Sequence, residues 1–312
     1  METYLIDYSG REYLLPVLLS WDMSYGCGLP CDAYEICVSY EPSMLPMLKG
    51  AVRMRAEHLG STVFFGVVDE YEVEISHKTG SRVKISGRGL AALLLDNEAE
   101  AMEYFSADIS VVLNDYVYPF GIKNVQILAG TPSIALKVTS GTSCYKVLEN
   151  YLWFSSGLKP TFDQLGRLII GERQGDLRII DQETAINHVV LKDKRYGVIS
   201  KVLVKNRVMG TTEVVENAEF TARGGCCQRI VNVPRTTNYD AMRKTGAYQI
   251  QCSKAGAKYI SVELPTLFAA FPGDRISLNV DNLAVAGEFK VAKARCFANE
   301  HNVGTVLELE SE

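Results

Sequence analysis

The segment at residues 87–92 is the closest match in the chain to a cofactor-binding motif. It reads Gly-Arg-Gly-Leu-Ala-Ala and fits G-x-G-x-x-A, in which glycines let a pyrophosphate approach a helix N-terminus. Residues 82–86 predict a strand before it and residues 90–105 a helix after it, and Asp108 follows about 20 residues on. The earlier strands have the pattern of hairpins, however, and no parallel sheet follows. We therefore favour a flexible strand-to-helix turn, with Arg88 at an interface, and predict no cofactor.

Cysteine spacing gives the next candidate. Cys27 and Cys31 form a C-x3-C pair, but a zinc site needs two further ligands, and His58 and His77 are not spaced as a second pair. The vicinal pair at 226–227 could respond to redox state. We predict that most of the eight cysteines are small buried thiols. No metal site is predicted.

Acidic side chains are the remaining candidates for catalysis. Asp69, Glu70, Glu72 and Glu74 form an acidic run, and paired carboxylates hydrolyse glycosides. In an extended strand, the three glutamates lie on one face, which is most simply a solvated one. The chain has only four histidines and lacks G-x-S-x-G, H-E-x-x-H and P-loop motifs. No catalytic residue is predicted.

Composition excludes several classes of protein. Of 312 residues, 47% are hydrophobic and 22% charged, which argues against disorder. The longest apolar runs, such as residues 90–95, are far shorter than a membrane span of about 20 residues. No signal peptide is expected. The formal net charge of -5 makes a nucleic-acid footprint unexpected, because such footprints depend on clustered Lys and Arg.

The first third of the chain predicts strands. Tyr34, Ile36 and Val38 alternate with more polar residues, which is the period of a half-buried strand. Residues 61–75 predict a longer strand, in which Gly66 indicates a bulge or a tight bend.

The middle third has helical patterns. Residues 108–118 and 142–156 predict helices, which end near Gly121 and at Gly157. Residues 159–162 and 167–170 then predict a strand pair. These elements indicate a small α/β module.

The last third predicts mostly strands again. The predicted strands are residues 198–205, 214–220, 228–233, 248–252, 258–264 and 275–280, followed by a closing hairpin of 288–297 with 303–309. Pro272 and Gly273 suit the central positions of a type II turn. Many short antiparallel strands indicate barrels or sandwiches. We therefore predict a mainly β fold of α+β class, with β domains at 1–95 and 196–312 flanking an α/β insertion at 96–195.

Several strings in this order resemble a known family. They are PVLLSW (16–21), GLPCDA (28–33), FGVVDE (65–70), VKISGRG (83–89), VYPFGI (117–122), residues 157–170, and residues 264–271 followed by PGDRI (272–276). Together they are similar to the baseplate hub proteins of contractile phage tails. This family includes the late-control gene D proteins of P2-like phages and the hubs of Mu-like phages, Gram-positive prophages and phage-tail-like bacteriocins.

This resemblance implies a structural role. In the family, two β-barrel-like tube domains flank an α/β insertion, and three chains form a ring. The six barrels of that homotrimer match the hexameric tail tube, and the opposite face holds the trimeric central spike. Other baseplate proteins and the tape measure are further expected partners, without specific nucleic acid or membrane insertion. The expected location is the baseplate of a virion or phage-tail-like particle, after synthesis in the bacterial cytoplasm.

Two other functions stay open from the sequence. Tail-tip proteins sometimes carry cell-wall hydrolase activity, although this chain shows no added catalytic domain. A nucleotide-binding protein using residues 87–92 is the third hypothesis.

Overall fold

The computed structural model describes residues 1–26, 31–78, 80–235, 237–280 and 285–310. The chain divides into two compact units, of which unit 1 is Met1–Val189 with Val262–Glu312 and unit 2 is Val190–Ser261. This division separates residues 190–261 from the residues that follow them. The three predicted domains, 1–95, 96–195 and 196–312, stay a prediction about the organisation of the chain.

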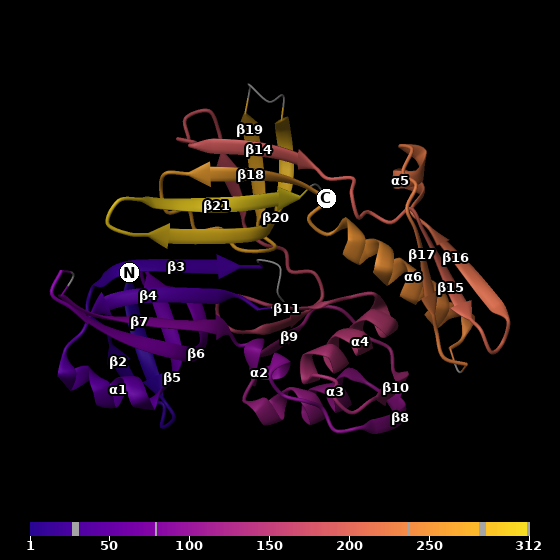
Figure 1. The fold of residues 1–312 in the computed structure, drawn as a ribbon, viewed down its shortest axis with the longest axis horizontal. Coiled ribbons are helices and arrows are strands. Elements are labelled where there is room, and N and C mark those ends of the chain that lie inside the picture. Colours follow the sequence, from indigo (N-terminus) through magenta and orange to yellow (C-terminus); the bar gives the residue numbers. More distant parts are fainter. Residues whose placement is uncertain (27–30, 79, 236, 281–284, 311–312) are drawn as a thin grey trace. The chain divides into compact units, whose positions relative to one another are not determined.

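Seven strands from the first third form one half of a large sheet in unit 1 (Figure 1). They are β1 (Glu2–Asp7), β2 (Glu12–Leu14), β3 (Leu18–Tyr25), β4 (Ala33–Ser39), β5 (Ala51–His58), β6 (Ser61–Ser76) and β7 (Gly80–Gly89), with the short helices η1 (Pro42–Met44) and α1 (Leu45–Gly50) between β4 and β5. The alternation predicted for β4 is confirmed at Tyr34, Ile36 and Val38, which are buried, and at Glu35, which is exposed, but Cys37 is buried as well. The buried alternate residues fix which face of this half packs inward.

The remaining strands of the large sheet come from later in the chain. They are β13 (Leu177–Ile180), β14 (His188–Asp193), β18 (Lys258–Leu264), β19 (Arg275–Val280), β20 (Val285–Ala298) and β21 (Val303–Glu310). The predicted closing hairpin is confirmed as β20 with β21. The predicted turn before β19 is also confirmed, since Gly273 has a φ of 93° and the Asp274 N–H donates to the Phe271 carbonyl at 2.9 Å. The chain leaves unit 1 along β14 and returns to it along β18.

The helices of the middle third enclose their own core. The elements are α2 (Ala92–Leu95), β8 (Met102–Ala107), α3 (Ile109–Tyr116), η2 (Tyr118–Phe120), β9 (Val125–Ile127), β10 (Ile134–Val138), α4 (Cys144–Ser156), β11 (Pro160–Phe162) and β12 (Leu168–Ile170). Both predicted helices are confirmed: Asp108 and Ser143 cap their N-termini. Gly157 ends α4 in the left-handed conformation that glycine adopts most easily. The predicted strand pair is β11 with β12.

The predicted helix at residues 90–105 is wrong. Only α2 is helical, and the Asn97 side-chain amide donates to the Leu93 carbonyl at 2.7 Å just after α2 ends. The chain then forms β8, which pairs with β10. The hydrophobic run at 90–95 has no helical period, so pairing with a distant strand outweighs its local helix propensity.

Besides parts of β14 and β18, the described residues of unit 2 form three strands and two helices. They are β15 (Lys201–Asn206), β16 (Thr211–Glu216), α5 (Ala218–Ala222), β17 (Gln228–Asn232) and α6 (Tyr239–Lys254). The predicted strand at 248–252 is wrong, because it lies inside α6. Met242, Gly246 and Ile250 are buried at a helical spacing of four residues. A Cβ at Gly246 would lie 2.4 Å from a Val215 methyl carbon, so α6 packs closely against β16.

The glycines of the first half-sheet permit close approach between strands. A Cβ at Gly87 would lie 1.9 Å from the Val67 carbonyl oxygen, and one at Gly66 would lie 2.1 Å from the Arg88 carbonyl oxygen. These contacts are with backbone, which cannot rotate away as a side chain does. The bend predicted at Gly66 is thus a position where only glycine fits.

We expect Gly87→Ala to lower the free energy of unfolding by about 2–3 kcal/mol, because the new methyl group must displace β6. Urea denaturation followed by circular dichroism measures this change. Gly50→Ala is the matched control, since its Cβ would meet only Asp7 at 3.8 Å. Its effect should stay within about 0.5 kcal/mol, and equal effects of the two substitutions would contradict the packing argument.

Candidate assembly surface

The two halves of the large sheet are joined by direct strand pairing. Residues Ala294 to Ala298 of β20 pair antiparallel with Tyr25 to Trp21 of β3. The sheet order is therefore continuous, β14-β18-β21-β20-β3-β4-β7-β6-β5-β1-β2. We call this β20–β3 pairing the junction. It matters for assembly because it holds the two half-sheets edge to edge.

One face of the junction is polar. The Arg295 guanidinium donates to the Asp22 carboxylate across the two strands, with Nε at 2.9 Å from Oδ2. The same guanidinium lies over the Phe297 ring, 5.3 Å from its centroid. An ion pair with this exposure contributes about 1 kcal/mol at most. The Arg295–Asp22 pair therefore contributes mainly by fixing the register of the two strands.

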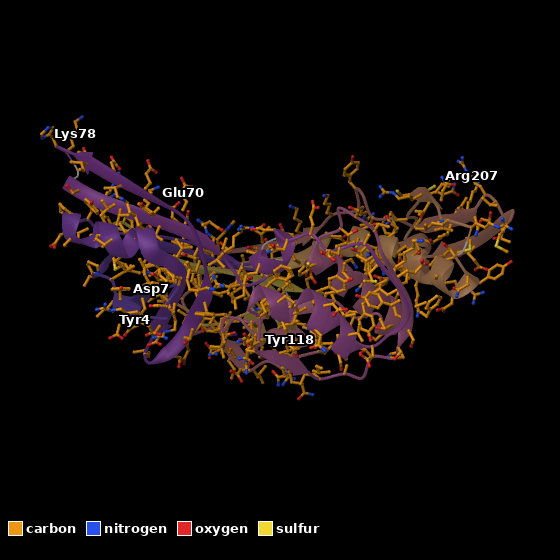
Figure 2. All side chains as sticks on the ribbon, turned by 90° about the horizontal axis from the view of Figure 1, so that it is seen from below. Tyr4, Asp7, Glu70, Lys78, Tyr118 and Arg207 are labelled. Atoms are coloured by element: carbon orange, nitrogen blue, oxygen red, sulfur yellow. The ribbon has the colours of Figure 1, made fainter. Side chains whose placement is uncertain are left out.

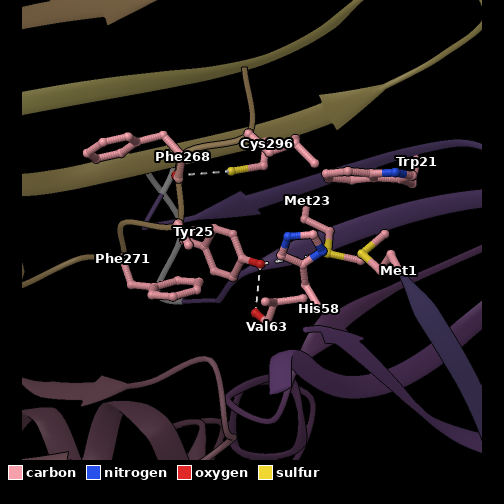
Figure 3. A pocket seen from close by; sticks show the side chains of 11 residues that line it. Met1, Trp21, Met23, Tyr25, His58, Val63, Phe268, Phe271 and Cys296 are labelled. Atoms are coloured by element: carbon pink, nitrogen blue, oxygen red, sulfur yellow. Dashed lines mark hydrogen bonds between the residues drawn. The ribbon is translucent and has the colours of Figure 1, made fainter. Parts of the chain in front are cut away.

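The other face of the junction is apolar and encloses a small cavity of about 70 Å³ (Figure 3). Its lining residues come from both halves: Met1, Trp21, Met23, Tyr25, His58, Val63, Leu267, Phe268, Ala269, Phe271 and Cys296. The Tyr25 hydroxyl donates to the Val63 carbonyl at 2.7 Å, and burial raises the pKa of this phenol well above its usual value. Ligand pockets usually have about 300–1,000 Å³. This cavity therefore belongs to packing and is too small for a nucleotide or a sugar.

A second, open hollow of about 440 Å³ lies on the first half-sheet. It is lined by Asp22, Ser24, Ala33, Tyr34, Glu35, Asp69, Ser86, Gly87 and Arg88. Arg88 donates to Asp69 at 2.7 Å and to Asp96 at 2.7 Å. Hydrogen bonds from Arg88 lower the pKa of Asp96, and those carboxylates raise the pKa of Arg88. Arg88 thus favours the ionised form of Asp96, which does not suit that carboxyl group to proton donation.

The predicted acidic run lies where the sequence indicated. Glu70, Glu72 and Glu74 are exposed along β6, and Figure 2 shows Glu70 partway along the β6–β7 hairpin, with Lys78 near its tip. Glu74 accepts from the Arg82 Nε at 2.8 Å across the hairpin. Asp69 stands apart from the glutamates, because the β6–β7 register shifts between Val68 and Glu70.

The G-x-G-x-x-A segment does not form a phosphate-binding loop. Gly87 and Gly89 lie inside β7, where they pair with β6, and the Gly89 N–H donates to the Asp32 carbonyl at 2.8 Å. The helix after them, α2, has only four residues. A phosphate needs free N–H groups at a helix N-terminus, so the nucleotide hypothesis has no structural support. The predicted turn is wrong as well, since both glycines are strand residues, and Arg88 is engaged by two carboxylates.

The cysteines differ from the prediction. Cys37 and Cys144 are buried and Cys31 and Cys296 are half-buried, but those at 226, 227 and 252 are exposed. Mostly buried thiols are therefore a wrong prediction for unit 2. Burial raises the pKa of the Cys31 thiol to about 11, which keeps it protonated. Cys27, the other member of the C-x3-C pair, lies outside the described residues.

Within the described ranges, no three His, Cys, Asp or Glu side chains are grouped so as to hold a metal ion. His58 lines the junction cavity and His188 begins β14. Helices of the described segments are too short or too polar to cross a membrane.

An internal repeat is the feature that sequence patterns did not locate. The first half-sheet has the order β1-β5-β6-β7-β4-β3, and the second has β13-β19-β20-β21-β18-β14. Apart from β2, which lies beside β1 and has no counterpart, the two orders match strand for strand, although β1 is antiparallel to β5 and β13 is parallel to β19. The signal in the sequence would have been the two long strands, β6 and β20, each followed at once by a hairpin partner. The repeat gives each chain two similar half-sheets.

Comparison with known structures identifies the fold. A tail protein from Neisseria meningitidis MC58 superposes with a TM-score of 0.79 at 16% identity, covering 100% of this chain and 96% of that one. The 43 kDa tail protein of prophage MuSo2 from Shewanella oneidensis gives 0.76 at 16% identity, with 100% and 98% covered. An E. coli type VI secretion component, itself structurally similar to the T4 tail proteins gp27 and gp5, gives 0.57 at 11% identity, with 95% and 73% covered.

These neighbours are phage tail proteins and a related secretion component, and the chain has their fold. The predicted mainly β architecture with α+β parts is therefore confirmed. No protein-family model and no curated protein matches the sequence.

The carboxyl group of Asp32, near the junction, should make stability depend on pH. Burial raises its pKa to about 6, against about 3.9 in the unfolded chain. Between about pH 4 and pH 6 the folded state holds the extra proton, so stability falls as pH rises through that window and stays lower above it. We expect Asp32→Asn to raise the free energy of unfolding by about 1–3 kcal/mol at pH 7 and by little at pH 4.

Urea denaturation at both pH values measures the effect, and the Asn oxygen can still accept from the Gly26 N–H, which now donates to Asp32 at 2.9 Å. Asp7→Asn is the control with the opposite sign, because a hydrogen bond from Ser9 lowers the pKa of Asp7. It should destabilise the protein at pH 7 and have less effect as pH falls. An Asp32→Asn effect that does not change with pH would contradict this reasoning.

Proposed function

We propose that this protein is the structural baseplate hub of a contractile phage tail or phage-tail-like particle. In this role three copies form a ring whose six half-sheets match the hexameric tail tube. The opposite face of the ring holds the trimeric central spike. The particle, whether a phage, a defective prophage or a bacteriocin, places the protein in its baseplate.

The observation that supports this proposal is the internal repeat joined by the junction. Two half-sheets with one strand order lie edge to edge in each chain. A closed ring requires complementary edges on successive subunits. With two similar edges per chain, a threefold ring presents a sixfold arrangement. A protein that joins six tube subunits to three spike subunits needs two similar half-sheets in each of its three chains.

The fold supports the same role. The neighbouring structures span nearly the whole chain rather than one domain of it. The proposed partners are the tail tube protein, the central spike, other baseplate proteins and the tape measure. A net charge of -5 suits a protein beside a DNA channel, because like charge does not retain passing DNA.

A cell-wall hydrolase is less well supported. Each carboxylate that lines the open hollow is paired with a cation: Asp69 with Arg88, Asp22 with Arg295 and Glu35 with Lys84. Glycoside hydrolysis needs one carboxylic acid with a raised pKa and one free carboxylate facing the same bond. We therefore propose a structural, non-catalytic role.

We expect the purified protein to show a mass in multi-angle light scattering three times its chain mass of 34.5 kDa, or to contribute three copies to the complex that forms once its tube and spike proteins are added. The tube and spike proteins should be taken from the neighbouring reading frames. A chain that stays monomeric with both partners would overturn the hub proposal. Lysis of peptidoglycan in a zymogram would favour the hydrolase instead.

A further inference from the structure

The two long strands of the repeat match in detail. In β6, Val67 is the last residue paired with β5, and the register with β7 shifts between Val68 and Glu70. In β20, Lys290 is the last residue paired with β19, and the register with β21 shifts between Val291 and Lys293. Each strand therefore leaves its first neighbour, bulges two residues later, and continues with a newly exposed edge.

Within the part of the chain that the structure describes, the exposed edge of β20 is paired with another strand, whereas the exposed edge of β6 is not. On β20, residues 294–298 begin two residues after the bulge and pair with β3 at the junction. The corresponding residues of β6 are 71–75. Among the described residues, no strand pairs with that edge of β6. The chain thus fills one of two equivalent edges and leaves the other open.

The counterpart of β3 is also open. In the matched strand orders, β3 follows β4 in the first half and β14 follows β18 in the second. β14 ends the sheet, and in the described part of the chain its outer edge has no strand beside it. Its side chains are mostly exposed, with Leu191 at 61%. An exposed apolar edge strand is a site for pairing with another chain.

We infer that residues 71–75 of β6 in one copy pair antiparallel with β14 of the next copy, so that the contact between chains repeats the junction within each chain. This inference rests on the proposed function, because it names the surfaces that would close the trimeric ring. The partner is a second copy of this chain. The pairing is head-to-tail, since two different strands meet, and it therefore allows a closed ring.

Charge and polarity fit this pairing. Glu72 and Glu74 lie on one face of β6, and Lys192 is exposed on β14. On the opposite face of β6 lie Tyr71, Val73 and Ile75, of which Ile75 is 77% exposed. Alternation in β14 places Lys192 with Val190 on one face and Leu191 with Asp193 on the other. The contact would set Lys192 beside the glutamates of β6 on one face and Leu191 beside its apolar residues on the other.

The signs of the charges differ between the two contacts. Within the chain, β20 supplies Arg295 and β3 supplies Asp22. Glu72 occupies the position on β6 that Arg295 occupies on β20, so β6 is acidic where β20 is basic. A β6–β3 pairing would set Glu72 against Asp22, and like charges on adjacent strands are unfavourable. The charges therefore select β14 for β6 and β3 for β20.

Cysteine cross-linking tests the inference on the full chain. Cys226, Cys227 and Cys252 are first changed to serine, because they are exposed and would cross-link by themselves. Glu72→Cys is then combined in turn with Val190→Cys, Leu191→Cys or Lys192→Cys, which samples the register of the two strands. Paired residues on adjacent strands come close enough for a disulfide only on the same face.

We expect mild oxidation to give covalent trimers with Cys at 190 or 192, and at least tenfold less product with Leu191→Cys, which points to the other face. Product with Leu191→Cys alone would still support the strand pairing, in a register shifted by one. There are two kinds of control. One is each single cysteine variant, and the other is Glu103→Cys combined with Lys192→Cys, because Glu103 is exposed on β8 and not on the proposed edge. These should give no covalent trimer.

The outcomes separate the two proposals. A protein that light scattering shows to be a trimer, but that forms no covalent trimer in any of the three combinations, would overturn the β6–β14 contact and leave the hub proposal standing. A protein that stays monomeric with tube and spike proteins present would overturn both. Covalent trimers equally abundant in the Glu103→Cys control would show that the cross-linking is unspecific and would also overturn the contact.

Discussion

The backbone pairing of β20 with β3 is the constraint on which the architecture depends. It joins residues that are far apart in sequence: Arg295 and Asp22, which form an ion pair across it, are separated by 273 positions. Because the hydrogen bonds of a sheet fix both distance and direction, the second half-sheet has a defined placement against the first. Apolar side chains from both half-sheets then line the inner face of the junction. A chain with separately linked domains would leave this placement to a flexible linker.

The bulges explain how one strand can serve two neighbours. A regular strand pairs with the same partner along its whole length, but β6 and β20 each change direction after a register shift. The first part of each strand stays in its own half-sheet, and the second part presents a new edge. Glycine at positions 66 and 87 lets the strands of the first half approach closely enough for this bend. Local backbone irregularity thus creates the surface that assembly would use.

The sequence predicted those features that depend on neighbouring residues. The alternation in β4, the glycine that ends α4 and the turn at Gly273 all follow from local sterics and burial, and all are confirmed. The errors at residues 90–105 and 248–252 arose where local propensity and tertiary packing disagree. The capping amide of Asn238 begins the helix that contains residues 248–252, so a search for helix caps would have found it.

The pairing of β20 with β3 could not be predicted from local sequence patterns. Which edges meet depends on which ones the bulges leave open, and the charges of Asp22 on β3 and Arg295 on β20 could not be matched before the strands and their bulges were known. The resemblance to tail hubs implied two similar domains per chain, but it did not indicate how they are joined. The repeat became visible only when the strand orders could be compared.

Because β6 and β20 present similar edges, something other than the backbone must determine which of them pairs with β3, and side-chain charge can do so. Backbone hydrogen bonds do not distinguish one strand from another, so β20 and β6 could in principle compete for β3. Arg295 on β20 meets Asp22 on β3, whereas the equivalent position on β6 is Glu72. The free-energy difference from one such pair is small, but each wrong pairing exchanges an attraction for a repulsion. Because β20 and β3 are in the same chain, their effective concentration is also far higher than that of edges on different chains. Both effects favour the junction within the chain, and in the proposed ring the acidic edge of β6 is the one that pairs with another copy.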